Sequence, residues 1–273
     1  MTKLWVLSDL HQEFKENAYD PLSNAPVDGF DVAVVAGDAH SPLARAMDWL
    51  GERMPGVPLV YVPGNHDFYW DGGEERYSLY DQMEKGRELA VRHGIHLLMD
   101  DAVVLDGTRF VGGTLWTDFR LGTYGWTHAS RSASGRFGMN DYRYIRKGHN
   151  TKTRLKPEDV RDMHRATAAF IRKTMATPHE GASVVVTHHA PHPTSLRSPY
   201  EDLRWCYASD LTELIHETAP EAWLHGHIHQ HADYQVGDTR VASNARGHDG
   251  EKSDFKDGWT VEVEPAPKAS PAP

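Results

Sequence analysis

Residues 58–67 have the sequence Pro-Leu-Val-Tyr-Val-Pro-Gly-Asn-His-Asp, a short apolar run that ends in a glycine turn and three polar side chains. A run of this length that is apolar at almost every position is typical of a strand buried on both faces. Because the carboxyl ends of strands in layered α/β folds form ligand sites, we expect the polar residues after such runs to converge. Four further runs show the same transition to Asp or His, at 4–7, 31–36, 183–187 and 222–224.

Helical segments are predicted between these strands, and each has a start or stop signal. Ser41 precedes the first segment, Gly94 ends the second, and Pro157 lies in the first turn of the third. The alternation of strands and helices indicates an α/β layered fold. The three helical ranges are 42–54, 74–93 and 158–175.

Two hairpins and a last strand are predicted in the remaining sequence. Each hairpin has a glycine-containing dipeptide between two apolar runs, which is a strong signal for a tight turn. Hairpins add antiparallel neighbours, so we expect sheets of mixed direction. The hairpins lie at 102–114, around Asp106-Gly107, and at 232–243, around Gly237-Asp238, and the last strand spans 259–263.

The composition is that of a globular protein with many histidines, 18 among 273 residues. Imidazole is the commonest metal ligand in proteins. The net charge of −10 argues against stable nucleic-acid binding through many neutralised phosphates. Cys206 is the only cysteine, so neither an intrachain disulfide nor a thiolate zinc cluster can form. The short N-terminal apolar run, and the lack of any stretch of about 18 apolar residues, predict a cytoplasmic protein with no membrane association.

We expect residues 1–264 to form a single domain, followed by a disordered Pro/Ala-rich tail at 265–273. An insertion at about 114–156 stands apart because it is rich in Gly, Ser, Tyr and Arg and shows little periodicity. Its nine Lys and Arg against two Asp give a local charge of +7. A loop or cap of this length inside a compact domain is usually functional or disordered.

The polar residues at the strand ends carry donors suited to metal ions. Asp9 and His11 are two residues apart, so in an extended segment both side chains face the same way and can hold one ion. His227 and His229 repeat this spacing. Asp38 follows a glycine turn, and the two oxygens of its carboxylate can bridge two cations.

A set of nitrogen and oxygen donors without sulfur suits Mn²⁺, iron, Zn²⁺ or Co²⁺. The neutral oxygen of Asn65 would complete such a set without adding charge. Two ions ~3.5–4 Å apart lower the pKa of a bridging water and position the attacking and leaving oxygens of a displacement at phosphorus. The donors therefore favour phosphate-ester chemistry.

His66 is predicted to point into the same pocket and to protonate the leaving oxygen as a general acid. Contact with bound phosphate alone is the other interpretation of this histidine. Asp67 is predicted to orient the His66 ring or a metal ligand. Asn65 is predicted to contact the substrate as well as an ion.

Five short blocks in a fixed order together resemble the calcineurin-like metallophosphoesterase superfamily, in its small bacterial-type members: Asp-x-His at 9–11, Gly-Asp at 37–38, Gly-Asn-His-Asp at 64–67, His-His-x-Pro at 188–191 and Gly-His-x-His at 226–229. The resemblance implies a sandwich of two mixed β-sheets flanked by helices. It also implies two divalent metal ions (Mn²⁺, Fe²⁺ or Fe³⁺, Zn²⁺ or Co²⁺), and it makes His188 rather than His189 a ligand. By the same resemblance, one ion would take Asp9, His11, Asp38 and His229, and the other Asp38, Asn65, His188 and His227.

Substrate contacts are predicted from the basic insertion if it folds over the site. Asn140, Arg143 and Arg146 would bind phosphate, while aromatic side chains would stack on a base or an aromatic leaving group. The other interpretation is a solvated loop whose arginines balance acidic neighbours, with aromatic residues such as Trp116 and Phe119 in a small core beneath it.

These features predict a metal-dependent phosphoesterase that hydrolyses a phosphodiester or phosphomonoester by attack of metal-bound hydroxide on phosphorus. The diester is slightly preferred, since the Gly-His-x-His ending and modest size resemble small phosphodiesterases. We expect the substrate to be a small-molecule phosphate ester, and a nucleotide-like compound is one candidate. The sequence predicts no oligomeric state. A phosphoprotein phosphatase or a nuclease of the same superfamily is the alternative. A non-catalytic metal-binding interaction scaffold is the alternative of another class, and the intact ligand set argues against it.

Overall fold

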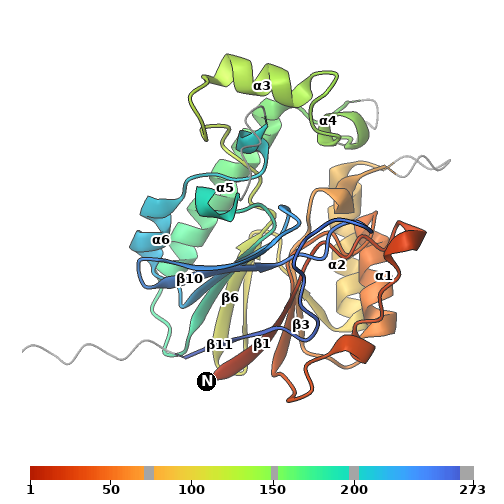
Figure 1. Cartoon of the computed structure of the whole chain (residues 1–273), viewed down its shortest axis with the longest axis vertical. Helices are drawn as coiled ribbons and strands as arrows, with labels where there is room; N and C mark the ends of the chain where they lie inside the picture. The colour runs from red at the N-terminus through yellow and green to blue at the C-terminus, as the bar shows by residue number, and fades with distance from the viewer. Residues whose placement is uncertain (71–76, 149–152, 197–202, 265–273) are drawn as a thin grey trace, which may run out of the picture.

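Two β-sheets face each other in the computed structural model, which describes residues 1–70, 77–148, 153–196 and 203–264 (Figure 1). The first sheet has the strand order β11 (Thr260–Val263), β1 (Thr2–Leu7), β2 (Val32–Val35), β3 (Leu59–Tyr61) and β4 (Ile95–Leu97). The second has the order β5 (Asp101–Leu105), β6 (Thr108–Gly113), β7 (Ser183–Thr187), β8 (Ala222–His225), β10 (Thr239–Asn244) and β9 (His231–Val236).

Both sheets are mixed. Strands β1 to β4 run parallel, and β11 pairs antiparallel with β1. In the second sheet, β6, β7, β8 and β10 are parallel, whereas β5 and β9 are antiparallel edge strands. The two predicted hairpins are therefore present as β5–β6 and β9–β10, and the predicted α/β layered fold with two mixed sheets is confirmed.

The continuous apolar runs arise because the central strands are buried on both faces. In β1, Leu4 and Val6 belong to the core between the two sheets. Trp5 and Leu7 point to the opposite face and pack with the helices there. Alternate side chains of a strand point to opposite faces, so both faces of β1 must be apolar. Strand β7 follows the same rule, with Val185 facing the outer helices.

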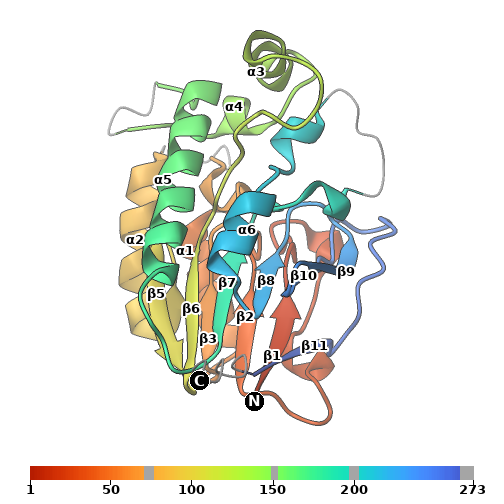
Figure 2. The same ribbon diagram turned by 90° about the vertical axis from the view of Figure 1, so that its left-hand side faces the viewer.

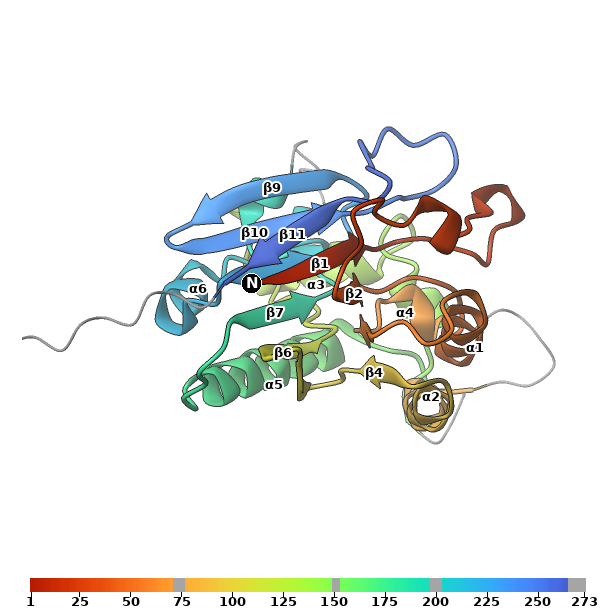
Figure 3. The same cartoon turned by 90° about the horizontal axis from the view of Figure 1, so that it is seen from below.

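Helices cover the outer faces of the sheets (Figure 3). The start and end of the second helix follow capping rules: Ser78 accepts a hydrogen bond from the Asp81 N–H, and Gly94 ends the helix with φ 69°. This helix begins later than predicted, and positions 74–76 lie outside the described residues. The first sheet carries α1 (Leu43–Arg53) and α2 (Leu79–His93), and the second carries α5 (Pro157–Met175) and α6 (Thr212–Thr218). Short 3-10 helices lie in the connections, at Lys15–Asn17, Leu22–Asn24, His66–Phe68, Pro193–Ser195 and Arg204–Cys206.

The insertion is more regular than its sequence predicts. It contains α3 (Trp126–Ser134) and α4 (Asp141–Tyr144), which lie above the strand ends (Figure 2). The inner face of α3 is a narrow stripe of two buried alanines, Ala129 and Ala133, so no broad apolar periodicity marks this helix in the sequence. The predicted small core is not separate, because Trp116 belongs to the same cluster as the helices of the first sheet.

Three expectations remain as predictions. The tail at 265–273 lies outside the described residues, as does Lys152 of the insertion. The single-domain organisation and the cytoplasmic location are the other two. Within the part of the chain that the structure describes, no helix is both long enough and apolar enough to cross a membrane.

The strand ends named above meet at the edge beneath α3 and α4 (Figures 1 and 2). The turns after β1 and β2 are joined by backbone hydrogen bonds: the Asp9 N–H donates to the Gly37 carbonyl at 3.0 Å, and the His11 N–H donates to the Asp38 carbonyl at 2.9 Å. This edge therefore carries the polar residues that the sequence analysis selected.

Candidate metal centre

Five of the seven predicted ligand residues adopt a left-handed backbone conformation. Non-glycine residues with positive φ are uncommon, and such strain is concentrated at functional sites where the surrounding structure enforces it. The turns after β1, β2 and β8 are thus shaped to aim side chains at one point. The φ values are 52° for Asp9, 47° for His11, 54° for Asp38, 69° for His227 and 45° for His229.

Asp9, His11 and His229 form one side of the site. The Nε2 atom of His229 lies 3.4 Å from Asp9 Oδ1 and 3.1 Å from His11 Nε2. Asp9 is fully buried, and its Oδ2 accepts a hydrogen bond from the His227 N–H at 3.0 Å. That contact ties the turn after β8 to the turn after β1.

Two glutamates fix the orientation of these imidazoles. Glu13 Oε1 lies 3.0 Å from the Nδ1 atom of His11, and Glu251 Oε2 lies 2.6 Å from the Nδ1 atom of His229. If each Nδ1–H donates to its carboxylate, the two Nε2 atoms face each other at 3.1 Å. Two imidazole lone pairs repel at this distance unless a proton or a metal ion lies between them, so the donors fit a metal ion.

The electrostatics of the site also favour a cation. Burial lowers the pKa of His229, but hydrogen bonds and charges from Asp9 and Glu251 outweigh burial and raise it to about 10. Burial likewise lowers the pKa of His188, and the Asp38 carboxylate outweighs it and raises the pKa to about 9. The carboxylates therefore attract positive charge strongly, and a divalent ion would compete with protons for the same nitrogen atoms.

Asp38, Asn65, His188 and His227 form the other side. His188 Nε2 lies 3.2 Å from Asp38 Oδ2 and 3.0 Å from Asn65 Oδ1, while its Nδ1 contacts the Ala36 carbonyl at 2.8 Å. The rings of His188 and His227 are 5.0 Å apart. The ligand atoms of Asp38, His188 and His227 lie within 4.8 Å of one another. Asp38 stands between the two groups, as a bridging carboxylate would.

His189 lies behind this cluster. Its ring packs on His227 with centroids 4.1 Å apart, and its Nδ1 lies 3.2 Å from the Thr114 carbonyl. His188, by contrast, points its Nε2 atom at Asp38 and Asn65. The choice of His188 as the ligand stays a prediction, and of the two neighbouring histidines it is the one whose Nε2 atom faces Asp38.

His66 lies beside the centre, and a carboxylate that the sequence analysis did not select contacts it. The His66 backbone N–H donates to Asp38 Oδ1 at 2.9 Å. Its ring stacks on Tyr69 with centroids 4.2 Å apart, and its Nδ1 lies 3.0 Å from Glu13 Oε1. The same glutamate oxygen contacts His11. Glu13 thus links a predicted metal ligand with the predicted general acid.

Asp67 supports the backbone of the site. It accepts hydrogen bonds from the Gly64 N–H at 2.6 Å, the Asp38 N–H at 3.1 Å and the Tyr61 hydroxyl at 2.7 Å. Burial, with the nearby Asp38 charge, raises the pKa of Asp67 to about 8. Asp67 is predicted from the sequence to orient either the His66 ring or a metal ligand. Its contact with the Asp38 N–H fits the second role, and the carboxylate that contacts the His66 ring is that of Glu13.

Glycines allow the backbone to approach the carboxylates. A Cβ atom on Gly64 would lie 2.0 Å from Asp38 Oδ1, and a Cβ atom on Gly226 would lie 2.6 Å from Asp9 Oδ2. Both distances are far below van der Waals contact. A side chain at either position would displace a predicted ligand.

An open cavity of about 520 Å³ leads to the centre. Its floor includes Asn65, His66 and His229, and Asn140 of the insertion lies on its wall. The floor is polar, whereas part of the wall is apolar. The apolar part comprises Phe137, Met139, Leu196, Leu203, Tyr207 and Ile228.

Neither Arg143 nor Arg146 is among the described residues that line this cavity. Arg146 is 8% exposed, and its guanidinium donates to the Arg143 carbonyl at 2.7 Å and lies over the Trp70 ring. Arg143 donates to Asn140 Oδ1 at 3.3 Å and also contacts the Arg136 carbonyl. The carbonyls at the end of a short helix need donors, and Arg146 supplies one to α4. The structure therefore brings Asn140 to the cavity without the two arginines.

Asp141 is a further residue that the sequence analysis missed. It is buried, and its Oδ1 accepts hydrogen bonds from Asn65 Nδ2 at 2.8 Å and from the Tyr69 hydroxyl at 2.6 Å. These bonds turn the Asn65 oxygen toward His188. An acidic residue in an otherwise basic insertion was the available signal. For Glu13, the signal was the spacing of two residues that continues from Asp9 and His11.

Comparison with known proteins agrees with this geometry. The model of the calcineurin-like phosphoesterase family matches residues 2–231. The uncharacterized protein L509 of Acanthamoeba polyphaga mimivirus is 24% identical over 278 residues, which cover 93% of this chain and 94% of the viral protein. The similarity thus extends over nearly the whole of both chains.

Two solved structures are similar in fold. The phosphopantetheinyl hydrolase PptH of Mycobacterium tuberculosis superposes with a TM-score of 0.69 at 18% identity, covering 99% of this chain and 98% of that one. A dimetal phosphatase from Danio rerio superposes with a TM-score of 0.51 at 14% identity, covering 89% and 86% of the two chains. At these identities, the likeness is one of fold.

Proposed function

The chain belongs to the calcineurin-like phosphoesterase family, and on that premise we propose that it is a two-metal hydrolase of small organic phosphate esters, with phosphodiesters preferred. Family membership and the donor set support metal-dependent hydrolysis of phosphate esters in general. The observation that carries the two-metal part of the proposal is the position of Asp38. Its carboxylate lies between the His188 and His227 group and the His11 and His66 group.

Two groups of side chains would hold the ions. One ion would bind Asp9, His11, Asp38 and His229, and the other Asp38, Asn65, His188 and His227. Bound there, the ions would lower the pKa of a water molecule and offset the negative charge of the phosphoryl oxygens. The chain itself orients four of these ligands: Glu13 contacts His11, Glu251 contacts His229, Asp141 contacts Asn65, and the carbonyl of Ala36 contacts His188.

We assign His66 as the general acid that protonates the leaving oxygen. It lines the cavity beside Asn65 and is positioned by two contacts, the Glu13 carboxylate at Nδ1 and the Tyr69 ring against its face. With Nδ1 held by a carboxylate, Nε2 is the atom that would deliver a proton to the leaving oxygen. The acceptor at Nδ1 would stabilise the protonated ring that precedes this transfer.

The cavity supports a small substrate with an organic group on the phosphate. A volume of about 520 Å³ is within the range of small-molecule pockets, and the aromatic side chains of Phe137 and Tyr207 lie on its wall. A base or another flat group could stack there. PptH, a hydrolase named for the phosphopantetheinyl group, is similar over nearly the full length of both chains and supports an organic phosphate ester. Arg143 and Arg146, which the sequence analysis predicted as phosphate ligands, do not line the cavity.

The proposal is tested by turnover of paired chromogenic esters. Metal-free protein is reconstituted with Mn²⁺, Fe²⁺, Co²⁺, Zn²⁺ or Mg²⁺ and assayed with bis(4-nitrophenyl) phosphate and 4-nitrophenyl phosphate. We expect turnover of both esters with at least one transition metal, and a higher kcat/KM for the diester. Asp38→Ala should reduce turnover to background, because it removes the shared ligand from both ions. Asp28→Ala, at an exposed loop position, is the matched control.

No turnover with any pairing would contradict the proposed function. If such protein nevertheless bound two ions per chain, the non-catalytic metal-binding scaffold would be the better description. A higher kcat/KM for the monoester would retain the hydrolase and overturn the preference for diesters.

A further inference from the structure

The segment after β10 reaches the metal centre from a part of the chain that the family model does not match, since that match ends at residue 231. Backbone hydrogen bonds fasten this segment to the end of β1. The Arg246 N–H donates to the Ser8 carbonyl at 3.0 Å, and the Gly247 N–H donates to the Asp9 carbonyl at 3.0 Å. Asn17 Nδ2 donates to the Gly247 carbonyl, also at 3.0 Å. The backbone before residue 248 is therefore held in place at the site.

The close approach of this segment to the centre depends on Gly247, which has φ 74°. A Cβ atom at this position would lie 3.1 Å from the Cβ atom of His229 and 2.6 Å from Glu251 Oε2. Glu251 Oε2 also accepts hydrogen bonds from the His248 N–H at 2.9 Å and lies 2.6 Å from His229 Nδ1. One carboxylate oxygen thus positions both His248 and a predicted metal ligand.

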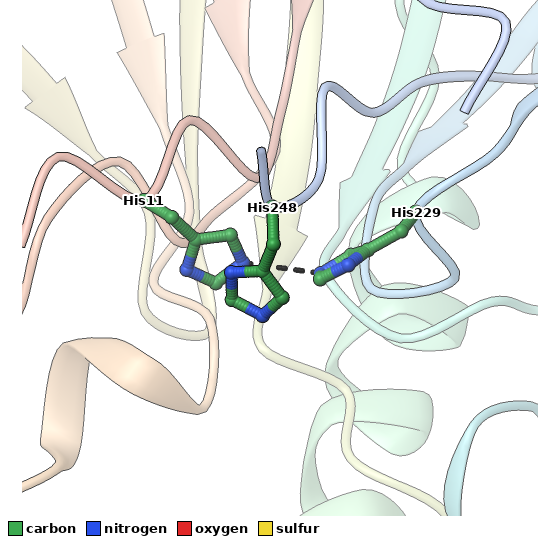
Figure 4. A group of neighbouring side chains, drawn as sticks. All are labelled: His11, His229 and His248. Carbon is green, nitrogen blue, oxygen red and sulfur yellow. Dashed lines mark hydrogen bonds between the residues drawn. The ribbon is translucent and has the colours of Figure 1, made fainter. Parts of the chain in front are cut away.

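His248 places its imidazole against the two histidines of the first ion position (Figure 4). Its ring centroid lies 4.4 Å from that of His11 and 4.9 Å from that of His229. A ligand nitrogen of each of the three rings lies within 4.8 Å of those of the other two. Donor atoms that share a single ion, each about 2.0–2.1 Å from the metal, lie roughly 3–4 Å apart, so a small shift of these side chains would bring the three nitrogens onto one ion.

We propose that His248 is a third imidazole ligand of the ion assigned to Asp9, His11, Asp38 and His229. The inference rests on the proposed function only in requiring that an ion binds there. It adds a ligand from a segment beyond the family match, and it makes the two ion positions chemically different. The first has three imidazoles, whereas the second has His188, His227 and the Asn65 amide oxygen.

The difference has a consequence for metal preference. Imidazole nitrogen binds Zn²⁺, Fe²⁺ and Co²⁺ more favourably than Mg²⁺, which prefers oxygen ligands. The first position should therefore discriminate against Mg²⁺ more strongly than the second. A role of His248 in contacting the phosphoryl group is the competing assignment, and it predicts a change in KM with unchanged metal affinity.

The test is metal binding by wild type, His248→Ala and His248→Gln. Metal-free proteins are titrated with Zn²⁺ and with Co²⁺ in competition with a chromophoric chelator, without substrate. Loss of the third imidazole should weaken one of the two binding steps by at least about 10-fold, which is the lower end of the loss found when only an outer-shell partner of a ligand is removed, and leave the other step unchanged. Added imidazole should restore part of the lost affinity in His248→Ala. His179→Ala, at a partly exposed position in the loop after α5, is the control and should bind as wild type does.

Thermal unfolding separates loss of a ligand from loss of fold. The metal-free variants should unfold at the wild-type temperature, and the increase in Tm on adding Zn²⁺ should be smaller in both His248 variants. Wild-type affinity for both ions in the two variants, with or without a change in KM, would overturn the inference. Wild-type protein that binds two ions, with weakened binding in the variants but no ester hydrolysis, would contradict the proposed function alone.

Discussion

Glu13 and His66 are joined by a contact of 3.0 Å between Glu13 Oε1 and His66 Nδ1. The same oxygen lies 3.0 Å from Nδ1 of His11. Glu13 thus contacts both His66, which we assign as the general acid, and His11, which we assign as a metal ligand, and it fixes the two rings relative to each other. Both histidines can donate to it only if each carries its proton on Nδ1, so Glu13 also selects which nitrogen faces the reaction.

The first prediction concerns this carboxylate. Glu13→Gln keeps the size of the side chain but removes its charge, so the His66 ring loses its ionic acceptor. We expect kcat to fall about 10- to 100-fold for esters with alkyl leaving groups. The loss should be smaller for nitrophenyl esters, because a good leaving group needs little help from a general acid. Glu16→Gln, on the exposed 3-10 helix nearby, should behave as wild type. An equal loss with both kinds of leaving group would contradict positioning of His66 by Glu13.

The second prediction separates His66 from the metal ligands. His66→Ala should retain two ions per chain, since His66 is not assigned to either ion. Turnover of an ester with an alkyl leaving group should fall about 100-fold or more, which is the usual contribution of a general acid. Elemental analysis and steady-state kinetics on the same preparation check both parts. A wild-type rate in this variant would remove His66 from the mechanism, and the exposed His128→Ala on α3 is the matched histidine control.

The third prediction tests the close approach of backbone to carboxylate. Gly64→Ala places a Cβ atom 2.0 Å from the position of Asp38 Oδ1, so that carboxylate must move away from its place between the two groups. We expect loss of metal binding and of activity, with a fold that circular dichroism still reports as native. Gly125→Ala is the control, because a Cβ atom there meets nothing within 4 Å. Retained binding of two ions by Gly64→Ala would show that Asp38 is not a bridge.

The fourth prediction concerns the wall of the cavity. Phe137 is 88% exposed, so Phe137→Ala should leave the free energy of unfolding nearly unchanged. If the organic part of the substrate stacks on it, KM for an aromatic ester should rise about fivefold or more, given ~1–3 kcal/mol for one stacked aromatic group. KM for a methyl ester should stay the same. Val91→Ala, at an exposed apolar position on α2, is the comparison, and equal KM values for both esters in Phe137→Ala would exclude the stacking.

Much of the fold and of the metal centre is visible in the sequence, because both follow from the same local pattern. An apolar strand that ends in Gly-Asp or Gly-His specifies a buried strand and a donor at its carboxyl end. Asp38 and His227 could be selected for this reason without knowing which strands are neighbours. Parallel pairing then brings the strand ends to one edge of each sheet.

The parts that could not be predicted depend on tertiary contacts. Glu13 continues the two-residue spacing of Asp9 and His11, but that spacing does not show that its side chain faces His11. His248 lies in a bend without a periodic pattern, and nothing local shows that its ring faces His11. Positive φ values are uncommon for residues other than glycine, so those at the ligands are imposed by the surrounding structure. Arginine commonly binds phosphate, which is why the sequence predicts Arg146 as a substrate contact. Its guanidinium instead donates to a backbone carbonyl of α4, which lies beside it only in the folded chain.

The central claim is that side chains from both sheets surround two ions that share Asp38. Crystals of the protein loaded with Mn²⁺ or Zn²⁺, measured at the absorption edge of the metal, test it most directly. The account predicts two anomalous peaks ~3.5–4 Å apart on opposite sides of the Asp38 carboxylate. A single peak, or peaks that do not touch Asp38, would contradict it.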